Sequence, residues 1–337
     1  MALINGMRAP LDFLAVGDIV IDDFIRLKDA HVTCRVDSTT CEICMRWGDK
    51  IPFEFAVTVP AVGNSANAAV AAARLGLKAG LRAYVGQDSH GQECIAQLMR
   101  EGVDATYVEK QEGKKTNYHY VLWFESQRTI LVKHEAFNYA LPPMPEGPKW
   151  LYLSSLGENS LPYHHMWADA LKRWPATKLA LQPGTYQMQF GTEALRDIYA
   201  RADIVFCNKE EAQRILGTPE ADMQALLSGM QALGSKVVLI TDDTRGAYCA
   251  SADKRYHVPR YPDPRPPYEI TGAGDAHASG TVAALALGLP LEDALLWGAA
   301  NASAVLQKIG AQEGLLTREQ LEAAIKNPPA PFALETF

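Results

Sequence analysis

The part of the chain from residue 149 onward alternates short apolar runs with longer amphipathic segments. Short apolar runs are typical of buried strands, and amphipathic segments are typical of surface helices. The predicted strands are 150–154, 178–182, 204–207 and 236–241, and the predicted helices among them are 163–174 and 209–216. Because parallel neighbours need a crossover connection, this alternation predicts a mostly parallel sheet with helices on both faces. The run FLAV at 13–16 is similar to the buried first strand of such a sheet.

Two stretches have a different pattern. Residues 28–60 are rich in Thr, Asp and Cys and alternate polar with apolar residues, and residues 115–135 contain two alternating runs around a short turn, as in a hairpin. We expect both to form a small, partly exposed β-sheet that serves as a lid. The predicted fold class is therefore α/β, with three layers (α/β/α) and a mostly parallel central sheet. Residues 1–27, 61–114 and 136–337 are predicted to form the main unit, and 28–60 and 115–135 the lid.

Composition excludes several classes of protein. The 337 residues include 32 Lys and Arg against 39 Asp and Glu, a net charge of −7, which argues against a nucleic-acid partner. The most apolar stretch, 281–306, is interrupted by Gly288, Pro290, Glu292 and Asp293, so it predicts two buried helices and no membrane span. The N-terminal residues lack the pattern of a secretory signal, and six cysteines are too few for a disulfide scaffold. We expect a cytoplasmic protein without a membrane or nucleic-acid partner.

The stretch EITGAGDA at 269–276 carries the clearest chemical signal. Small residues such as Gly272 and Gly274 let a ligand approach the backbone closely, and successive N–H groups at the start of a helix bind anions. Asp275, beside them, can accept a proton from a hydroxyl group. Phosphoryl transfer needs these two parts side by side. The structural alternative is a glycine turn with an aspartate cap, and neither a dinucleotide-binding nor a Walker A pattern is present.

This motif and several others, in order over about residues 11–318, resemble the ribokinase-like (PfkB) carbohydrate kinase family. The matching stretches are VGDIVIDDFI, GNSANAAVAAARLGL, YVGQDSHGQECIAQLMREGV, NKEE at 208–211, LITDDTRGAY, TGAGDA and GAANASAVLQKIGA. The resemblance implies a kinase that uses ATP and Mg²⁺ to phosphorylate a hydroxymethyl group of a small molecule. It also makes a monovalent cation such as K⁺ a further candidate cofactor, and a homodimer through the lid the expected assembly.

The resemblance also implies a role for individual residues. Asp275 is the expected general base, and the backbone amides around Gly272, Ala273 and Gly274 are expected to stabilise charge on the transferring group. The expected acceptor-binding residues are Asp22, Gly63, Asn64 and Asn67. The expected nucleotide-binding residues are Asn208, Thr241, Gly246, Thr271 and Asn301, and Glu211 is expected to act on Mg²⁺ indirectly. The chain departs from the family pattern at Val62-Gly63, Gln182-Pro-Gly184, Asp243 and Glu269-Ile270, where the family favours a Gly pair, a D-x-N element, a Gly and Asp-Thr.

Each of these residues also has a purely structural interpretation. Asp22 could bind backbone amides at a strand end, and Asn64 and Asn67 could be a cap and a first-turn residue. Asn208 and Glu211 could form the capping box of the helix at 209–216, where the helix dipole favours an acidic side chain by only about 0.3–1 kcal/mol. We favour the functional interpretation because the motifs occur together and in order.

Three cysteines, Cys34, Cys41 and Cys44, fall in the predicted lid. They could bind zinc or act in redox chemistry, with His31 the nearest fourth ligand. Separate thiols are the interpretation that we favour.

Two other sets of residues in or near the lid bear on the acceptor. The aromatic residues are Trp47, Phe53, Phe55, Trp123 and Phe124, which either stack on a substrate or pack in a dimer interface. The basic residues are Arg26, Arg35, Arg46, Arg128, Lys133 and His134, which could bind the phosphate of a sugar phosphate. We rank a free sugar or sugar acid first, a nucleoside second and a sugar phosphate third. A non-catalytic ligand-binding protein with the same fold is the alternative from another class.

Overall fold

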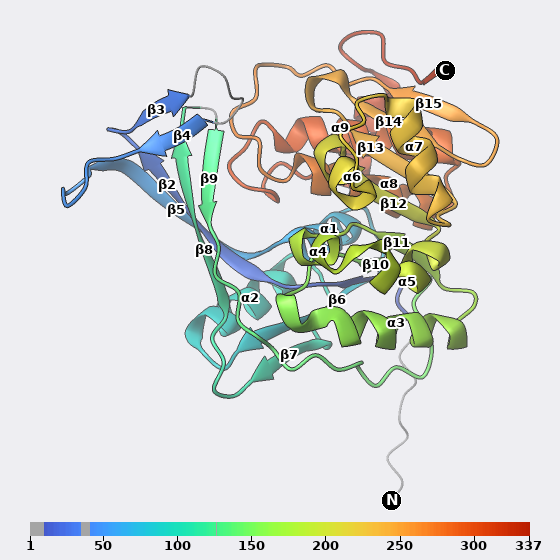
Figure 1. Ribbon diagram of the computed structural model, residues 1–337, viewed down its shortest axis with the longest axis horizontal. Coiled ribbons are helices and arrows are strands. Elements are labelled where there is room, and N and C mark those ends of the chain that lie inside the picture. Colours follow the sequence, from blue (N-terminus) through green and yellow to red (C-terminus); the bar gives the residue numbers. More distant parts are fainter. Residues whose placement is uncertain (1–9, 35–40, 126) are drawn as a thin grey trace, which may run out of the picture.

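The computed structural model describes residues 10–34, 41–125 and 127–337, and its largest element is a ten-stranded sheet (Figure 1). Its strand order is β16-β15-β14-β13-β12-β11-β10-β1-β6-β7. The strands are β1 (Phe13–Val16), β6 (Ala79–Gly86), β7 (Val108–Gln111), β10 (Trp150–Leu153), β11 (Lys178–Leu181), β12 (Ile204–Asn208), β13 (Val237–Thr241), β14 (Ala247–Ala250), β15 (Arg255–Val258) and β16 (Glu335–Thr336). From β7 to β13 all neighbours are parallel, and β14 to β16 add an antiparallel edge. The predicted, mostly parallel sheet is confirmed.

Helices cover both faces of this sheet, as the side chains of β1 show. Phe13 and Ala15 pack into one core, whereas Leu14 and Val16 pack into the other, because successive side chains of a strand point to opposite faces. The first core holds residues of α1 (Asn64–Arg74), α2 (Ser89–Arg100), α8 (Ala273–Ala286), α9 (Leu291–Val305) and α10 (Arg318–Lys326). The second holds residues of α3 (Leu161–Arg173), α4 (Thr185–Ala194), α5 (Arg196–Arg201), α6 (Lys209–Leu216) and α7 (Met223–Ala232), and short 3₁₀ turns lie at η1 (Glu158–Ser160) and η2 (Asp243–Arg245). The three-layer prediction is confirmed.

The apolar stretch 281–306 forms the end of α8 and most of α9, which are separated near Gly288 and Pro290, as the sequence predicts. Both helices bury most of their length, and α8 packs against α1 as well as α9. Among the helices of the described ranges, none is both long and apolar enough to cross a membrane.

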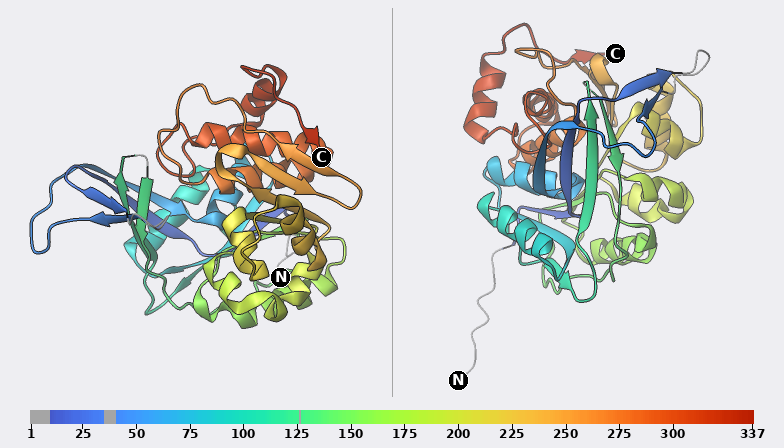
Figure 2. Two further views of the ribbon diagram at one scale, coloured as in Figure 1. Left: turned by 45° about the horizontal axis from the view of Figure 1, so that its top comes forward. Right: turned by 90° about the vertical axis from the view of Figure 1, so that its left-hand side faces the viewer.

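A second, four-stranded sheet stands to one side of the helical layers, at the left of Figure 1, and faces the viewer in the right-hand view of Figure 2. Its order is β5-β2-β8-β9, with β2 (Val20–Leu27), β5 (Phe53–Val62), β8 (Asn117–Phe124) and β9 (Gln127–Leu131). The predicted hairpin at 115–135 is therefore present as β8 and β9. The sequence analysis predicts residues 20–27 in the main unit, but as β2 they pair with β5 and β8 in the smaller sheet. Only residues 17–19 separate β1 from β2, so the sequence offers no loop that would mark the change of sheet. The division of the remaining ranges into two units stays a prediction.

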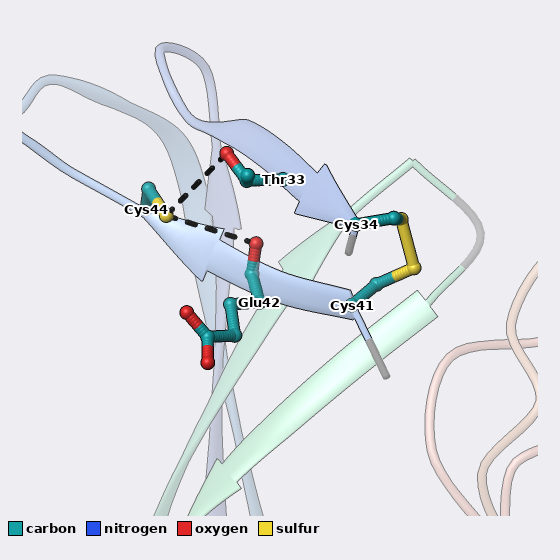
Figure 3. Close-up of a disulfide and its surroundings, with 5 residues drawn as sticks. All are labelled: Thr33, Cys34, Cys41, Glu42 and Cys44. Atoms are coloured by element: carbon teal, nitrogen blue, oxygen red, sulfur yellow. Dashed lines mark hydrogen bonds between the residues drawn. A yellow bond between two sulfur atoms is a disulfide. The ribbon is translucent and has the colours of Figure 1, made fainter. Parts of the chain in front are cut away.

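A two-stranded hairpin of β3 (His31–Cys34) and β4 (Cys41–Cys44) extends from the smaller sheet. Cys34 lies directly opposite Cys41 in this hairpin, with Cα atoms 4.1 Å apart, and the two form a disulfide (Figure 3). The prediction of separate thiols is therefore wrong for this pair, because the antiparallel register brings them together, whereas Cys44 is a free thiol. Residues 35–40 of the predicted lid, Arg35 among them, and residues 1–9 of the predicted main unit lie outside the described residues.

Candidate active site

A cavity of about 510 Å³ lies where the carboxyl ends of the parallel strands face the smaller sheet. This edge is where ligands bind in open α/β sheets. Main-chain and side-chain atoms from β2, β8, β9, α1, β12, β13 and the start of α8 line it. The lining residues predicted from the sequence are Asp22, Gly63, Asn64, Asn67, Asn208, Glu211, Thr241, Thr271, Gly272, Ala273, Gly274 and Asp275. The structure thus brings twelve of the predicted site residues to one cavity.

Asp275 lies in the first turn of α8, directly after a sharp turn at Gly272. Gly272 has φ 82°, and a Cβ atom there would lie 2.5 Å from the Cα of Ala311, so only glycine fits at this position. A Cβ built on Gly274 would meet nothing within 4 Å, so the backbone of this turn is open to the cavity. The first N–H groups of a helix have no acceptor within the helix. Such N–H groups are suited to bind an anion, and here they lie next to the Asp275 carboxylate.

Three side-chain amides hold the Asp275 carboxylate. Asn64 Nδ2 and Asn67 Nδ2 each donate a hydrogen bond of 2.8 Å, to Oδ1 and Oδ2, and Gln182 Nε2 donates to Oδ1 at 2.9 Å. Burial raises the pKa of Asp275, although these amides and the charge of Arg128 act in the opposite direction. A carboxylate that is oriented and more basic than usual is suited to accept a proton from a substrate hydroxyl.

Gln182 is a further residue of this site, although from the sequence it is evident only as a departure from a motif. It follows β11 at the same edge of the sheet as the other site residues. Its Oε1 accepts a hydrogen bond from the buried Tyr152 hydroxyl, which leaves Nε2 to point at Asp275. Its position directly after a parallel strand was the signal that could have identified it.

Glu269 fixes the approach to this turn. Its buried carboxylate accepts hydrogen bonds from Thr271 N at 2.8 Å, from Thr271 Oγ1 at 2.6 Å and from Gly310 N at 3.2 Å. It therefore links the strand-to-helix turn to the loop after α9, and it places Thr271 at the cavity wall.

One end of the cavity lies against the smaller sheet and is polar. Asp22 and His119 are directly paired across β2 and β8, with Asp22 Oδ1 3.3 Å from His119 Nδ1. Asp22 Oδ1 and His119 Nε2 are buried and make no hydrogen bond to any described residue. Buried polar atoms normally have a partner, so these two atoms are available to the hydroxyl groups of a ligand. Behind them, Asp18 accepts hydrogen bonds from the Tyr139 hydroxyl at 3.0 and 3.2 Å.

The other end of the cavity is bounded by the start of α6. Asn208 and Glu211 form a reciprocal capping box, in which Glu211 N donates to Asn208 Oδ1 at 2.8 Å and Asn208 N donates to Glu211 Oε2 at 2.9 Å. The capping box that the structural interpretation predicts for Asn208 and Glu211 is thus observed, and both residues also line the cavity. Burial raises the pKa of Glu211, and the charge of Asp275 raises it further. The carboxylates of Glu211 and Asp275 therefore lie at the same cavity and influence each other's charge.

A second cavity of about 540 Å³ continues from this end. Thr241 and Gly246, which the family resemblance leads us to expect at the nucleotide, both line it. Apolar residues form much of its wall: Val258, Pro259, Tyr261, Pro266, Pro267, Ile270 and Leu306. An apolar slot beside an anion site suits a nucleotide, whose base is flat and whose phosphates are charged.

Asn301 is the predicted site residue that the structure places away from both cavities. It is fully buried in α9, where Nδ2 donates to Ala276 O and Oδ1 accepts from Leu316 N. Through these hydrogen bonds its side chain links α8 to the segment after α9. The residue type alone could not distinguish a structural role from a ligand-binding role, because an asparagine side chain forms hydrogen bonds with backbone groups as readily as with a ligand.

The predicted aromatic residues of the lid do not line either cavity. Trp123 is buried and packs edge-on against Phe55 and Tyr268, with ring centroids 6.0 and 5.3 Å away. Trp47 is fully exposed. Stacking of these rings on a substrate is thus not supported by their positions.

Comparisons with known proteins agree with this geometry. The sequence profile described as "pfkB family carbohydrate kinase" matches residues 49–318, which is most of the chain. The chain is 25% identical over 267 residues to a ribokinase of Haemophilus influenzae, covering 77% of this chain and 85% of the relative. It is 25% identical over 266 residues to a nucleoside kinase of Methanocaldococcus jannaschii, covering 77% of this chain and 83% of the relative. Among solved structures, Arabidopsis thaliana ribokinase complexed with ribose and ATP has a TM-score of 0.77 at 21% identity, and the match covers 95% of this chain and 100% of that one.

Proposed function

The chain belongs to the pfkB family of carbohydrate kinases, and on that premise we propose that it transfers the γ-phosphoryl group of ATP to a hydroxymethyl group of a small sugar or sugar acid. The observation that carries this proposal is the position of the Asp275 carboxylate, which lies beside the open N-terminus of α8 and is held by three side-chain amides. A protein that only bound its ligand would have no use for an oriented carboxylate base beside the open N-terminus of a helix. ATP is the phosphoryl donor that the related structure with ribose and ATP suggests.

In the proposed reaction the acceptor hydroxyl lies against Asp275. The carboxylate accepts the hydroxyl proton as the oxygen attacks the γ-phosphorus, and the bond from that phosphorus to the bridging oxygen of ADP breaks. The N–H groups at residues 272–274 donate to the oxygens of the transferring group, where negative charge is greatest. Asn64 and Asn67 keep the carboxylate oriented towards the hydroxyl.

Glu211 and Asn208 are the residues that would act on Mg²⁺. When bound to ATP, Mg²⁺ supplies charge neutralisation of the phosphates, and it keeps several water molecules. The described residues contain no group of three or more His, Cys, Asp or Glu side chains that could hold a metal ion. A carboxylate at the cavity wall that acts through water, as Glu211 could, fits a metal that arrives with the nucleotide.

The second proposed cation, K⁺, fits less well. In this chain the Glu269 carboxylate itself joins the turn at Thr271 to the loop at Gly310. We therefore derive no step through a monovalent cation.

The lining of the acceptor end favours a sugar over a nucleoside. It consists of Val20, Asp22, Asn64, Asn67, His119 and Ile130, together with Gln182. Among the described residues at this end, His119 carries the only ring, so no aromatic wall is available for a base. Polar groups that can exchange hydrogen bonds with several hydroxyls dominate instead, which suits a polyhydroxylated acceptor.

The experiment that tests this function is a panel assay. Purified protein is incubated with Mg·ATP and, separately, with pentoses, hexoses, sugar acids, nucleosides and sugar phosphates, and ADP formation is measured. We expect ADP that depends on a sugar or sugar acid, and a phosphate ester on a hydroxymethyl carbon in the product. Fastest turnover with a nucleoside would replace the proposed acceptor class, and no acceptor-dependent ADP from the whole panel would favour a non-catalytic binding protein.

We also propose that the protein forms a homodimer through the smaller sheet. Phe53 on β5 and Leu131 on β9 are 55% and 52% exposed, and these are the edge strands of that sheet. Exposed edges with apolar side chains favour pairing with another strand. Light scattering after size-exclusion chromatography tests this, and a monomer at all concentrations would contradict it.

A further inference from the structure

Gln312, in the loop after α9, has a buried side chain that the reaction described above does not use. Its neighbour Ala311 lines the first cavity, whereas Gln312 lies outside the described lining of both cavities. Gln312 Nε2 donates to Ala61 O at 2.7 Å and to Asn67 Oδ1 at 3.0 Å, and these partners are 251 and 245 positions away in the sequence. Both hydrogens of this NH₂ group are therefore used within the protein.

The hydrogen bond from Gln312 determines which way the Asn67 amide points. An asparagine amide has an oxygen on one side and an NH₂ group on the other, and a half turn exchanges them. Because Gln312 Nε2 can only donate, the Asn67 oxygen faces Gln312, and Asn67 Nδ2 faces Asp275 Oδ2 at 2.8 Å. In the turned amide an oxygen would face the carboxylate, and two NH₂ groups would face each other. Gln312 thus selects the orientation that stabilises the Asp275 carboxylate.

The orientation of Gln312 is in turn set by a backbone carbonyl, that of Ala61. A carbonyl oxygen only accepts hydrogen bonds, so it requires the NH₂ end of the glutamine. Ala61 is buried and has φ 62°, which a residue with a Cβ atom rarely adopts. It lies where β5 of the smaller sheet leads through Gly63 into α1. One side chain therefore supports both this connection and the orientation of Asn67.

The backbone around Gln312 is held independently of its side chain. Arg74 Nη1 donates to Gln312 O at 2.8 Å and to Leu315 O at 2.9 Å. Arg74 also forms two hydrogen bonds with the Glu101 carboxylate, from Nε at 2.8 Å and from Nη2 at 3.0 Å. Such a bidentate pair fixes the guanidinium. The loop should therefore stay in place when only the side chain of Gln312 is replaced.

The Asn67 amide has a direct effect on the proposed base. Burial raises the pKa of Asp275, and among the groups that lower it the hydrogen bond from Asn67 comes first, ahead of those from Gln182 and Asn64. A hydrogen bond to the charged form of a carboxyl group stabilises that form. Loss of the donation from Asn67 would therefore raise the pKa of Asp275 further and leave one of its oxygens unheld.

We propose that Gln312 is a positioning residue of the reaction, which holds the Asn67 amide with its NH₂ group on Asp275 and so keeps the base directed at the acceptor hydroxyl. This inference rests on the proposed function. Gln312 itself contacts neither substrate, and no proton leaves or reaches it. Its effect on the reaction passes through Asn67.

The first test compares Gln312→Met, which keeps the length of the side chain but has no donor, with wild type in the full-length protein. With the best acceptor of the panel we expect kcat to fall about 10- to 100-fold, as for other small misplacements of a catalytic group. The acid limb of the kcat/KM profile, where activity falls with falling pH, should move up by about one pH unit, because Asp275 loses one hydrogen-bond donor. The KM for Mg·ATP should stay unchanged.

Gln307→Met is the matched control. Gln307 is a glutamine of the same loop, and its side chain bonds to Arg265 through both its oxygen and its NH₂ group. We expect wild-type kcat and a wild-type acid limb in this control. Equal changes in both variants would show that any disturbance of the loop has the effect, and they would overturn the proposal.

A double-mutant cycle tests whether Gln312 acts through Asn67. Asn67→Ala removes the amide that Gln312 orients, so Gln312→Met should change neither kcat nor the acid limb further in that background. The same loss in both backgrounds would show that Gln312 acts by another route, which would contradict the proposed role.

Gln312→Met should also lower the melting temperature, because Ala61 O loses its donor. Gln312→Glu is the second variant in case the first does not fold. It has nearly the same shape, and its ionised carboxylate cannot donate, so the acid limb should rise at least as far. Wild-type kcat with an unmoved acid limb in either folded variant would refute the inference.

A titration without substrate keeps this inference separate from the proposed function. The protonation of Asp275 can be followed by infrared difference spectra of wild type against Asp275→Asn. The pKa obtained in this way should be higher in Gln312→Met than in wild type, whichever acceptor the protein uses, and an equal pKa would count against Gln312. Loss of phosphoryl transfer in Asp275→Asn, by contrast, tests the proposed function alone.

Discussion

Replacement of Asp275 by Asn removes the proposed base and changes little else in shape. A positioned general base contributes about 10²–10⁴ in rate. At 1.36 kcal/mol for each tenfold change, this corresponds to roughly 3–5 kcal/mol of transition-state stabilisation. We therefore expect kcat to fall by at least about 10²-fold, with the acceptor still bound.

The structure indicates how the site would accommodate the new amide. Three NH₂ groups donate to Asp275, and an asparagine at this position would have one oxygen to accept them and an NH₂ group of its own. Asn67 cannot turn, because its Oδ1 accepts from Gln312 Nε2 at 3.0 Å, and Gln182 is held by Tyr152. Asn64 has no second hydrogen bond of its side chain within the described residues, so its amide can turn and present its oxygen. The cost to stability is then the loss of charge-assisted hydrogen bonds, about 1–3 kcal/mol.

The assay measures kcat from ADP formation at saturating acceptor, with the melting temperature and acceptor affinity determined in parallel. Asp243→Asn is the matched control, because it removes a carboxylate from the same cavity without a contact to Asp275. We expect a much smaller loss of kcat in the control. A kcat of Asp275→Asn within about tenfold of wild type, in a folded protein, would refute the role of Asp275 as base.

Three further predictions concern the same site. Because the pKa of Asp275 is raised and only the ionised form accepts a proton, activity should be lost as the pH falls through a value above the ordinary aspartate pKa of about 3.9, and an acid limb of kcat/KM at or below it would contradict this. Gly272→Ala should lower the free energy of unfolding by about 1–3 kcal/mol in urea titrations, because φ is 82° and Ala311 blocks the new methyl group, whereas Gly274→Ala should leave stability unchanged. Glu211→Gln should raise the Mg²⁺ concentration needed for half-maximal activity while keeping the melting temperature, since an amide oxygen can still accept the capping hydrogen bond, and an unchanged Mg²⁺ requirement would argue against its proposed role.

The parts of the site that were predictable from the sequence are those in which local pattern and function coincide. The turn at 272–275 must start a helix with an open N-terminus, and small residues followed by an apolar helix indicate this without tertiary information. Likewise, Asn67 lies in the first turn of α1, as the sequence suggests, whereas the expected cap, Asn64, is the first helical residue and Gly63 takes the N-cap position. The parallel sheet was predictable for the same reason, since alternation of strands and helices is a local signal.

The parts that were not predictable depend on pairing over long distances. Arg128 faces the cavity only because β9 pairs with β8, and β8 with β2, in one particular register. A shift of one residue would turn the side chain to the other face. For Asn301 the local motif matched the family, but its hydrogen-bond partners were not predictable. Its side-chain amide bonds to Ala276 O and Leu316 N, which lie in other segments of the chain.

The proposed acceptor residues lie at two of the places where the chain passes between the smaller sheet and the main unit. β1 leads into β2 through residues 17–19, so Asp22 lies near the start of a lid strand. β5 leads into α1 through Gly63, so Asn64 and Asn67 lie just after the end of another. An acceptor that binds Asp22 and Asn64 together would therefore hold these two connections at a fixed distance. It would thereby fix the orientation of the smaller sheet, which carries Arg128, relative to the main sheet. Because Asn64 and Asn67 also hold Asp275, we expect acceptor binding, lid position and orientation of the proposed base to be coupled. Before the acceptor binds, the lid and the Asp275 carboxylate would therefore not both be in their catalytic positions. Water that enters the site at this stage would react only slowly with ATP, as a kinase requires.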